Sequence, residues 1–158
     1  MPLKRFRKPL LLVHITASVA LLGATSSSLL LAIVAATDDE LAHSAYELMS
    51  LQSLVFGIPL SFIALGTGIA VGFAGKWGVL RYRWTAAKLV LMVAVILNGA
   101  LVLGPTTARR MDGAGSAWGL VLAEVLQVVL LLIPMWLSVY KPGGRLRRAQ
   151  AARVIATR

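Results

Sequence analysis

The sequence contains no cysteine, only two histidines and only six acidic residues among 158. The lack of cysteine excludes disulfides, thiolate-bound metals, iron–sulfur clusters and a cysteine nucleophile. Only His14 falls within an apolar run, so a membrane haem held by two imidazoles is excluded as well. The sequence also lacks a Gly-rich phosphate loop and a His-Glu-x-x-His motif, and we expect no metal site.

Four long apolar runs fill most of the chain, of which 58% is hydrophobic. Each is long enough for a membrane helix, which needs about 20 apolar residues. The connections are short, so consecutive helices are expected to run antiparallel. The sequence therefore predicts an all-α fold, a transmembrane four-helix up-down bundle over residues 1–140 with a basic tail over 141–158, and with spans of about 9–36, 49–74, 84–104 and 117–140.

Charge is distributed unevenly along the chain, whose net charge is +10. Basic residues gather at the N-terminus, between residues 76 and 83, and in the tail, whereas residues 37–48 carry acidic side chains and no lysine or arginine. The positive-inside rule then predicts that both termini lie in the cytoplasm. Basic ends facing an anionic cytoplasmic leaflet account for the charge, so we expect the lipid bilayer as a partner and no nucleic acid.

Local signals mark where the helices begin and end. Thr37 and Glu40 have the spacing of a capping box, which predicts a new helix at this point. The following residues, 38–48, either extend the second spanning helix or lie as a short helix on the membrane surface. Pro59 is expected to kink the second helix, and Gly104–Pro105 to end the third.

Small residues recur every three or four positions along the second apolar run. Lipid provides no hydrophobic drive between helices, so such residues mark the faces on which helices pack closely. The sequence therefore predicts a helix-packing face consisting of Gly57, Ser61, Gly68 and Gly72.

The few polar residues within the runs are expected to face the bundle interior, because lipid would leave them without partners. Their depths, at about 1.5 Å per residue, place them in two layers. An inner layer contains His14 and Lys88, near the cytoplasmic surface. An outer layer forms an intramembrane polar cluster of Asn98, Glu124, Gln127 and Gln52.

Residues 10–104 resemble an uncharacterised, actinobacterial-type family of small four-span integral membrane proteins. The similar features are Leu11-Leu-Val-His14, the acidic first loop with Tyr46, Pro59 with the glycines that follow it, and Trp77-Gly-Val-Leu-Arg-Tyr-Arg-Trp84 before Lys88. The resemblance implies a bacterial plasma membrane protein with several spans. The family has no established activity, so no function follows from it.

More remotely, His14 and the pattern Trp84-x-x-x-Lys88 are similar to the bacterial membrane protoporphyrinogen oxidase family and to CopD-type copper-resistance membrane proteins. In the oxidase family the corresponding histidine and lysine are the functional pair, and haem b is bound. The resemblance implies that His14 and Lys88 bind a cofactor, for which haem b is the candidate. The chain departs from that family in lacking the aromatic pattern after the histidine and a second transmembrane histidine.

Three functions remain open from the sequence. The first, which we favour, is an accessory or partner-binding membrane protein that forms a homo-oligomer or binds another membrane protein. The second is a haem- or tetrapyrrole-binding redox protein that uses His14 and Lys88. The third is an oligomeric proton or cation transporter subunit that uses Glu124. The sequence does not decide whether the protein is an enzyme.

Overall fold

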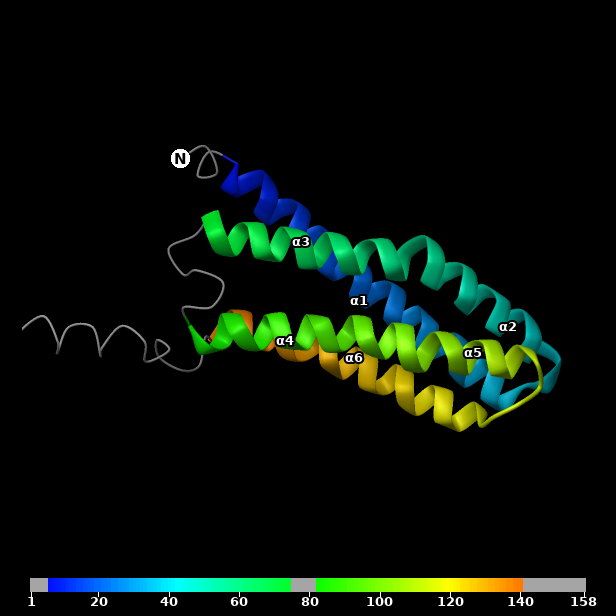
Figure 1. The fold of residues 1–158 in the computed structure, drawn as a ribbon. Coiled ribbons are helices and arrows are strands. Elements are labelled where there is room, and N and C mark those ends of the chain that lie inside the picture. The colour runs from blue at the N-terminus through cyan, green and yellow to red at the C-terminus, as the bar shows by residue number, and fades with distance from the viewer. Residues whose placement is uncertain (1–5, 75–81, 141–158) are drawn as a thin grey trace, which may run out of the picture.

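The computed structural model describes residues 6–74 and 82–140, and each element in these ranges is helical (Figure 1). The predicted basic tail over 141–158 lies outside the described residues. In chain order the elements are α1 (Arg7–Thr37), α2 (Asp39–Gln52), η2 (Ser53–Gly57), α3 (Ile58–Ala74), α4 (Arg83–Asn98), η3 (Gly99–Leu103), α5 (Gly104–Met111) and α6 (Ala117–Tyr140), where η marks a π-helical turn.

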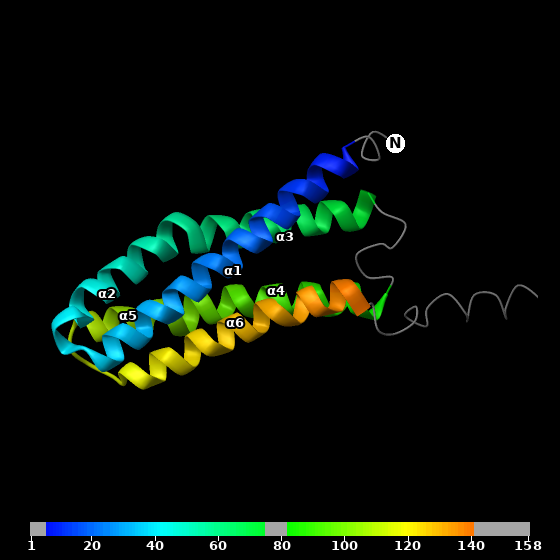
Figure 2. The same cartoon turned by 180° about the vertical axis from the view of Figure 1, so that it is seen from behind.

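These elements make four long helices, because α2, η2 and α3 follow one another without a break, as do α4, η3 and α5. Consecutive long helices run in opposite directions (Figures 1 and 2). The start of α1 and the end of α6 lie together at one end of the bundle, here named the Arg7 end. The α1–α2 turn and the α5–α6 turn lie at the other, the Asp38 end. The predicted all-α helical bundle is confirmed.

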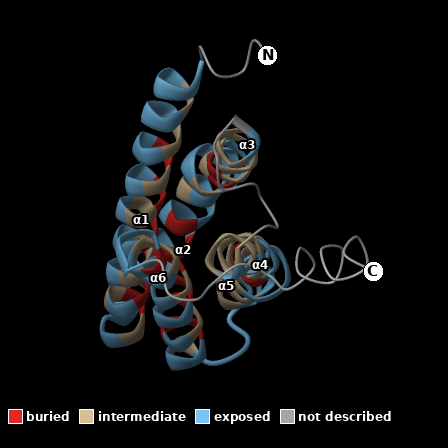
Figure 3. Cartoon of the chain, turned by 90° about the vertical axis from the view of Figure 1, so that its left-hand side faces the viewer, coloured by how far each residue is buried: buried red, intermediate tan, exposed pale blue. Residues whose placement is uncertain are grey.

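The surface of the bundle is apolar over its length. Among the described residues, four helices are long and apolar enough to cross a membrane: Arg7–Thr37, Asp39–Phe73, Arg83–Met111 and Ala117–Tyr140. Buried residues lie along the lines where helices meet, and the outward faces are exposed (Figure 3). Large side chains on these faces, such as Leu122 at 70% and Val90 at 67% exposure, need an apolar solvent. Length and composition therefore allow all four long helices to span a membrane.

The turn between α1 and α2 consists of a single residue, Asp38. Its backbone is extended, and its carboxylate accepts hydrogen bonds from the amides of Glu40 at 3.0 Å and Leu41 at 3.2 Å. The Thr37 hydroxyl instead donates to the Ile33 carbonyl at 3.0 Å, so the predicted cap at Thr37 is wrong by one residue. Because α2 leads directly into η2 and α3, residues 39–48 extend the second spanning helix.

Two prolines explain the two π-helical turns. Proline has no amide hydrogen, and its ring clashes with the carbonyl four residues before it in an α-helix. For Pro59 and Pro105 that carbonyl lies inside η2 and η3, respectively. The amides of Ile58 and Gly104 bond back five residues, to Ser53 and Gly99, which is π-helical bonding. The sequence predicted that the third helix ends at Gly104–Pro105. This prediction is wrong, because the helix continues through these residues to Met111.

The core consists of two apolar clusters separated along the bundle. Near the Asp38 end lies the Tyr46 cluster, and nearer the Arg7 end lies the Leu21 cluster. α1 contributes to both, since it packs against α2, α3 and α6, while α4 packs against α6. The Tyr46 cluster consists of Ala32, Ala35, Ala45, Tyr46, Met49, Leu120 and Val121, and the Leu21 cluster of Leu21, Val95 and Leu131.

Arg110 contacts two other parts of the Asp38 end through its side chain. Its Nε donates to the Tyr46 hydroxyl at 3.1 Å, and its guanidinium carbon lies 5.5 Å from the centre of the Tyr46 ring. Its Nη1 donates to the Gly115 carbonyl at 2.8 Å. Gly113 and Gly115 have φ values of 74° and 87°, which only glycine adopts readily, so the turn before α6 is tight. One side chain thus joins α2, α5 and this turn.

Candidate functional site

Two amides join α4 to α6 between the apolar clusters. Asn98 Nδ2 donates to Gln127 Oε1 at 2.9 Å, and Gln127 Nε2 donates to the Val95 carbonyl at 3.1 Å. Asn98 Nδ2 also lies 3.3 Å from the Ala123 carbonyl. Both side chains are buried, and their donors are satisfied by each other or by backbone. The structure thus brings together two residues that the sequence assigned to the outer layer.

Glu124 lies on α6, one turn before Gln127. Only 4% of the residue is exposed, and its Oε2 has no hydrogen-bond partner among the described residues. A buried carboxyl oxygen without a partner is uncommon, because losing water without gaining a donor costs free energy. Glu124 is therefore the group in the bundle whose chemistry is least explained by packing.

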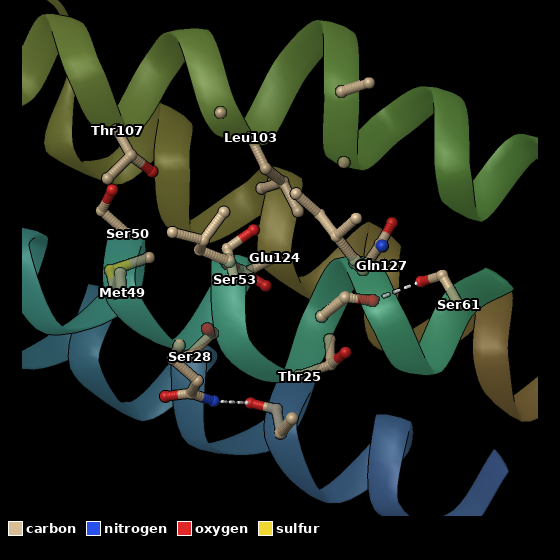
Figure 4. Close-up of a pocket in the computed structure, with 18 of the residues that line it drawn as sticks. Thr25, Ser28, Met49, Ser50, Ser53, Ser61, Leu103, Thr107, Glu124 and Gln127 are labelled. Carbon is tan, nitrogen blue, oxygen red and sulfur yellow. Dashed lines mark hydrogen bonds between the residues drawn. The ribbon is translucent and has the colours of Figure 1, made fainter. Parts of the chain in front are cut away.

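The unpartnered carboxyl belongs to the wall of a cavity of about 540 Å³ (Figure 4). This volume is within the range of small-molecule sites, roughly 300–1,000 Å³. In Figure 4, Ser53, Ser61, Glu124 and Gln127 surround the same space, and Thr25 and Ser28 of α1 lie below them in this view. Both π-helical turns contribute to the wall, which suits their frequent occurrence at functional sites.

The two apolar clusters close the cavity at its ends. Met49 of the Tyr46 cluster and Leu21 and Val95 of the Leu21 cluster are part of the lining. Along α1 and α6, residues of the cavity wall lie between residues of one cluster and residues of the other. The polar layer thus lies between two apolar layers of the bundle.

Gln52 also lines the cavity, from the second long helix. Its Nε2 donates to the Ala24 carbonyl of α1, which ties the two helices together. All three amides of the outer layer thus direct donors toward backbone or one another. This leaves the hydroxyl oxygens of the wall and Glu124 as groups that face the cavity.

His14 is held against α3. Its Nδ1 lies 3.0 Å from the Ala64 carbonyl and 3.2 Å from Thr67 Oγ1. A carbonyl only accepts, so Nδ1 carries the hydrogen. The ring lies over Gly68: a Cβ atom built there would be 3.0 Å from His14 Cε1.

Lys88 is held by different neighbours. Its Nζ donates to Ser138 Oγ of α6 at 2.5 Å and lies 4.9 Å from the centre of the Trp84 ring. Neither His14 nor Lys88 lines the cavity. The Ala64 bond engages Nδ1 and leaves Nε2 as the His14 nitrogen that could bind a metal. The cofactor site predicted at His14 and Lys88 stays a prediction.

The predicted helix-packing face divides into two parts. Gly68 makes a tight contact within the chain, against His14. Gly57 and Ser61 line the cavity, where the Ser61 hydroxyl donates to the Gly57 carbonyl at 2.6 Å. Gly72 is half-buried further along α3.

Some residues of the site were missed in the sequence. Thr107 lines the cavity and is buried, yet it follows Gly104–Pro105, where a helix end was expected. Ser50 and Ser53 also line the cavity, on the part of the second helix that precedes Pro59. The sequence signal for this part of the wall is a glycine placed one or two residues before a proline, as in Gly57 with Pro59 and Gly104 with Pro105. Among the described residues, no group of three metal-ligating side chains is present.

No protein-family model, curated protein or solved structure matches this chain. The resemblance to small actinobacterial-type membrane proteins therefore stays a prediction.

Proposed function

We propose that the protein is a membrane-embedded accessory protein that binds a small ligand in the Glu124 cavity. The observation that carries the proposal is Glu124, which lines this cavity and whose Oε2 is buried without a partner among the described residues. A ligand that brings a donor or a positive charge would remove the cost of burying that oxygen. A glutamate with a purely structural role would be expected to bond a neighbouring helix, as Asn98 and Gln127 do.

The composition of the wall favours binding over catalysis. Glu124 is the one ionisable side chain among the described residues that line the cavity. General acid–base chemistry normally uses a second group with a matched role, and a nucleophile needs a base beside it. Hydroxyls, amides and apolar side chains supply the rest of the wall, which suits recognition of a molecule.

The proposal includes a place for the chain in the bacterial plasma membrane. The positive-inside rule supports a cytoplasmic location for the Arg7 end and for both termini, while the acidic residues Asp38, Asp39 and Glu40 mark the opposite side. The cavity then belongs to the outer half of the bilayer. A homo-oligomer or a membrane partner protein is compatible with the large apolar outer surface.

Transport of a proton or cation is a weaker alternative. A buried acid is the residue that such a path would use. However, the Leu21 cluster separates the cavity from the Arg7 end, and Leu21 and Val95 are 2% and 0% exposed. A continuous polar path through one chain is therefore lacking among the described residues, and conduction would need a second copy.

A hydrophobic carbodiimide tests the proposed site. Dicyclohexylcarbodiimide is a small apolar molecule that adds to carboxyl groups in apolar surroundings. Wild-type protein in phosphatidylcholine vesicles should gain the reagent's mass on the peptide that contains Glu124, and Glu124→Gln should not. Mass spectrometry of the digested protein gives the extent of modification.

Glu47 provides the matched control, because its side chain is 60% exposed near the Asp38 end. A water-soluble carbodiimide should modify Glu47 and leave Glu124 intact. If Glu124 stays unmodified by the apolar reagent while Glu47 reacts with the soluble one, the cavity does not admit small molecules and the proposed function is wrong.

A further inference from the structure

The polar groups that line the cavity indicate which ligand head groups can form hydrogen bonds or ion pairs there. The described lining has one acidic side chain and no basic one. The amide donors of Asn98, Gln127 and Gln52 are directed to each other or to backbone carbonyls, and the Ser61 hydroxyl donates to Gly57. What distinguishes the wall is thus one carboxyl group, with hydroxyls around it that can accept as well as donate. An anionic ligand would find no basic side chain among the described lining residues, whereas a cationic ligand would find the Glu124 carboxyl.

The position of the exposed lining residues specifies how a ligand enters. Leu54, Ile58 and Phe62 line the cavity and are 66%, 49% and 58% exposed. Across from them, Ile96 and Ala100 belong to the third long helix. We name these five residues the lateral mouth. In a spanning helix, exposed apolar side chains of this kind lie among the lipid tails.

Resting on the proposed function, we infer that the Glu124 cavity binds an amphiphilic amine in its ammonium form, which enters from the lipid through the lateral mouth. The ammonium lies at Glu124 and the neighbouring hydroxyl oxygens, where charge-assisted hydrogen bonds are strongest. The apolar chain extends past Phe62 and Leu54 toward the lipid. Buried residues of the Tyr46 and Leu21 clusters, Met49, Leu21 and Val95, belong to the lining toward the two ends, so entry is expected from the side, where Leu54, Ile58 and Phe62 are exposed.

Three matched probes separate the head group from the chain. N,N-dimethyldecylamine has both the charge and the chain, decanol has the chain alone, and N,N-dimethylethylamine has the charge alone. The tertiary amines form no amide with the activated carboxyl. Each is added to wild-type protein in phosphatidylcholine vesicles before dicyclohexylcarbodiimide, and the rate of Glu124 modification is followed by mass spectrometry.

We expect dimethyldecylamine to slow the modification about tenfold, as near-complete occupancy would, and the other two to change it less than about twofold. Equal protection by decanol would overturn the inference while leaving the proposed function intact, since Glu124 would still be reached and occupied. Absence of modification in the untreated protein would instead overturn the proposed function.

The same assay identifies the source of the ammonium group. Replacing half of the phosphatidylcholine by phosphatidylethanolamine adds a membrane lipid with a primary ammonium. Slower loss of the unmodified Glu124 peptide, without any added amine, assigns the site to such a lipid; loss of unmodified peptide is the measure here because a primary amine can form an amide with the activated carboxyl. An unchanged rate, together with protection by dimethyldecylamine, assigns it to a free lipophilic amine.

Substitutions at the lateral mouth test the entry path. Ala100→Trp should slow carbodiimide modification several-fold, because the indole fills the opening. Leu101→Trp is the control, since Leu101 is 69% exposed in the same π-helical turn and does not line the cavity. Phe62→Ala should accelerate the modification, because it widens the opening. This variant tests the same path if Ala100→Trp fails to fold. Equal rates in Ala100→Trp, Phe62→Ala and wild type would show that the ligand does not enter here.

Discussion

The His14 ring occupies the space into which any side chain at Gly68 would project, with Cε1 3.0 Å from an ideal Cβ at that position. Nδ1 of the same ring bonds the Ala64 carbonyl, so the imidazole has little freedom to move aside. The small-residue face of the second apolar run is, at this point, a contact inside the chain.

Gly68→Leu should therefore weaken the contact between α1 and α3. Overpacking of this kind costs about 1–3 kcal/mol, which we expect as a lower thermal midpoint of the detergent-solubilised protein. Gly66→Leu is the control, because nothing lies within 4 Å of a Cβ at Gly66. Adding His14→Ala to Gly68→Leu should restore part of the loss; a double variant no better than Gly68→Leu would show that the ring is not what the leucine meets.

The Asn98–Gln127 pair should show coupling in a double-mutant cycle. Asn98→Ala leaves Gln127 Oε1 without its donor, and Gln127→Ala removes the acceptor of Asn98. Hydrogen bonds between membrane helices contribute on the order of 0.6 kcal/mol, with larger values near 1.7 kcal/mol. Denaturation in mixed micelles measures the two single variants and the double variant, and strict additivity of their effects would contradict a direct bond.

Arg110 should stabilise the Asp38 end of the bundle more than Arg109 does. Arg110→Gln loses the bonds to Tyr46 and Gly115, which we expect to cost about 1–3 kcal/mol in unfolding free energy. Tyr46→Phe keeps the packed ring and removes the hydroxyl, so it should cost less. Arg109→Gln changes the same charge on an exposed residue and should be near neutral; equal effects of the two arginine variants would mean that only charge matters.

The proposed topology can be tested with single cysteines, since the chain has none of its own. Ser44→Cys and Lys8→Cys place a thiol on exposed residues near the Asp38 end and the Arg7 end. A membrane-impermeant maleimide applied to intact cells should modify the first and reach the second only after the membrane is permeabilised. The reverse pattern would invert the topology and move the cavity to the cytoplasmic half of the bilayer.

The sequence was sufficient for the large features because membrane helices are specified by simple quantities. Length and apolarity predict the spans, and the exclusion of polar groups from lipid directs Asn98, Glu124 and Gln127 inward. Periodicity could not pair these groups. That Asn98 bonds Gln127 while Glu124 Oε2 is left without a partner depends on how α4 and α6 pack, which the sequence alone does not specify.

Other features were not predicted because a local sequence signal, such as a capping residue or a proline, is compatible with more than one backbone structure. Thr37 and Asp38 can both cap a helix, and the extended backbone at Asp38 selects the second. Gly104–Pro105 reads as a helix end, but five-residue bonding in η3 lets the helix continue and brings Thr107 to the cavity. The inner residues His14 and Lys88 share a depth, yet the bonds described for them lead to α3 and α6 respectively.

The paired π-helical turns also carry a consequence for sequence length. A turn that bonds five residues back holds one residue more than an α-helical turn, and one residue corresponds to about 100° of helix rotation. Removing a single amino acid from Ser53–Gly57 would therefore take away the extra residue of the wide turn, while the α2 and α3 segments could keep the faces with which they pack. A chain shortened by one position in both η2 and η3 would lose the two wide turns that contribute to the cavity wall, and the cavity beside Glu124 would then be expected to shrink.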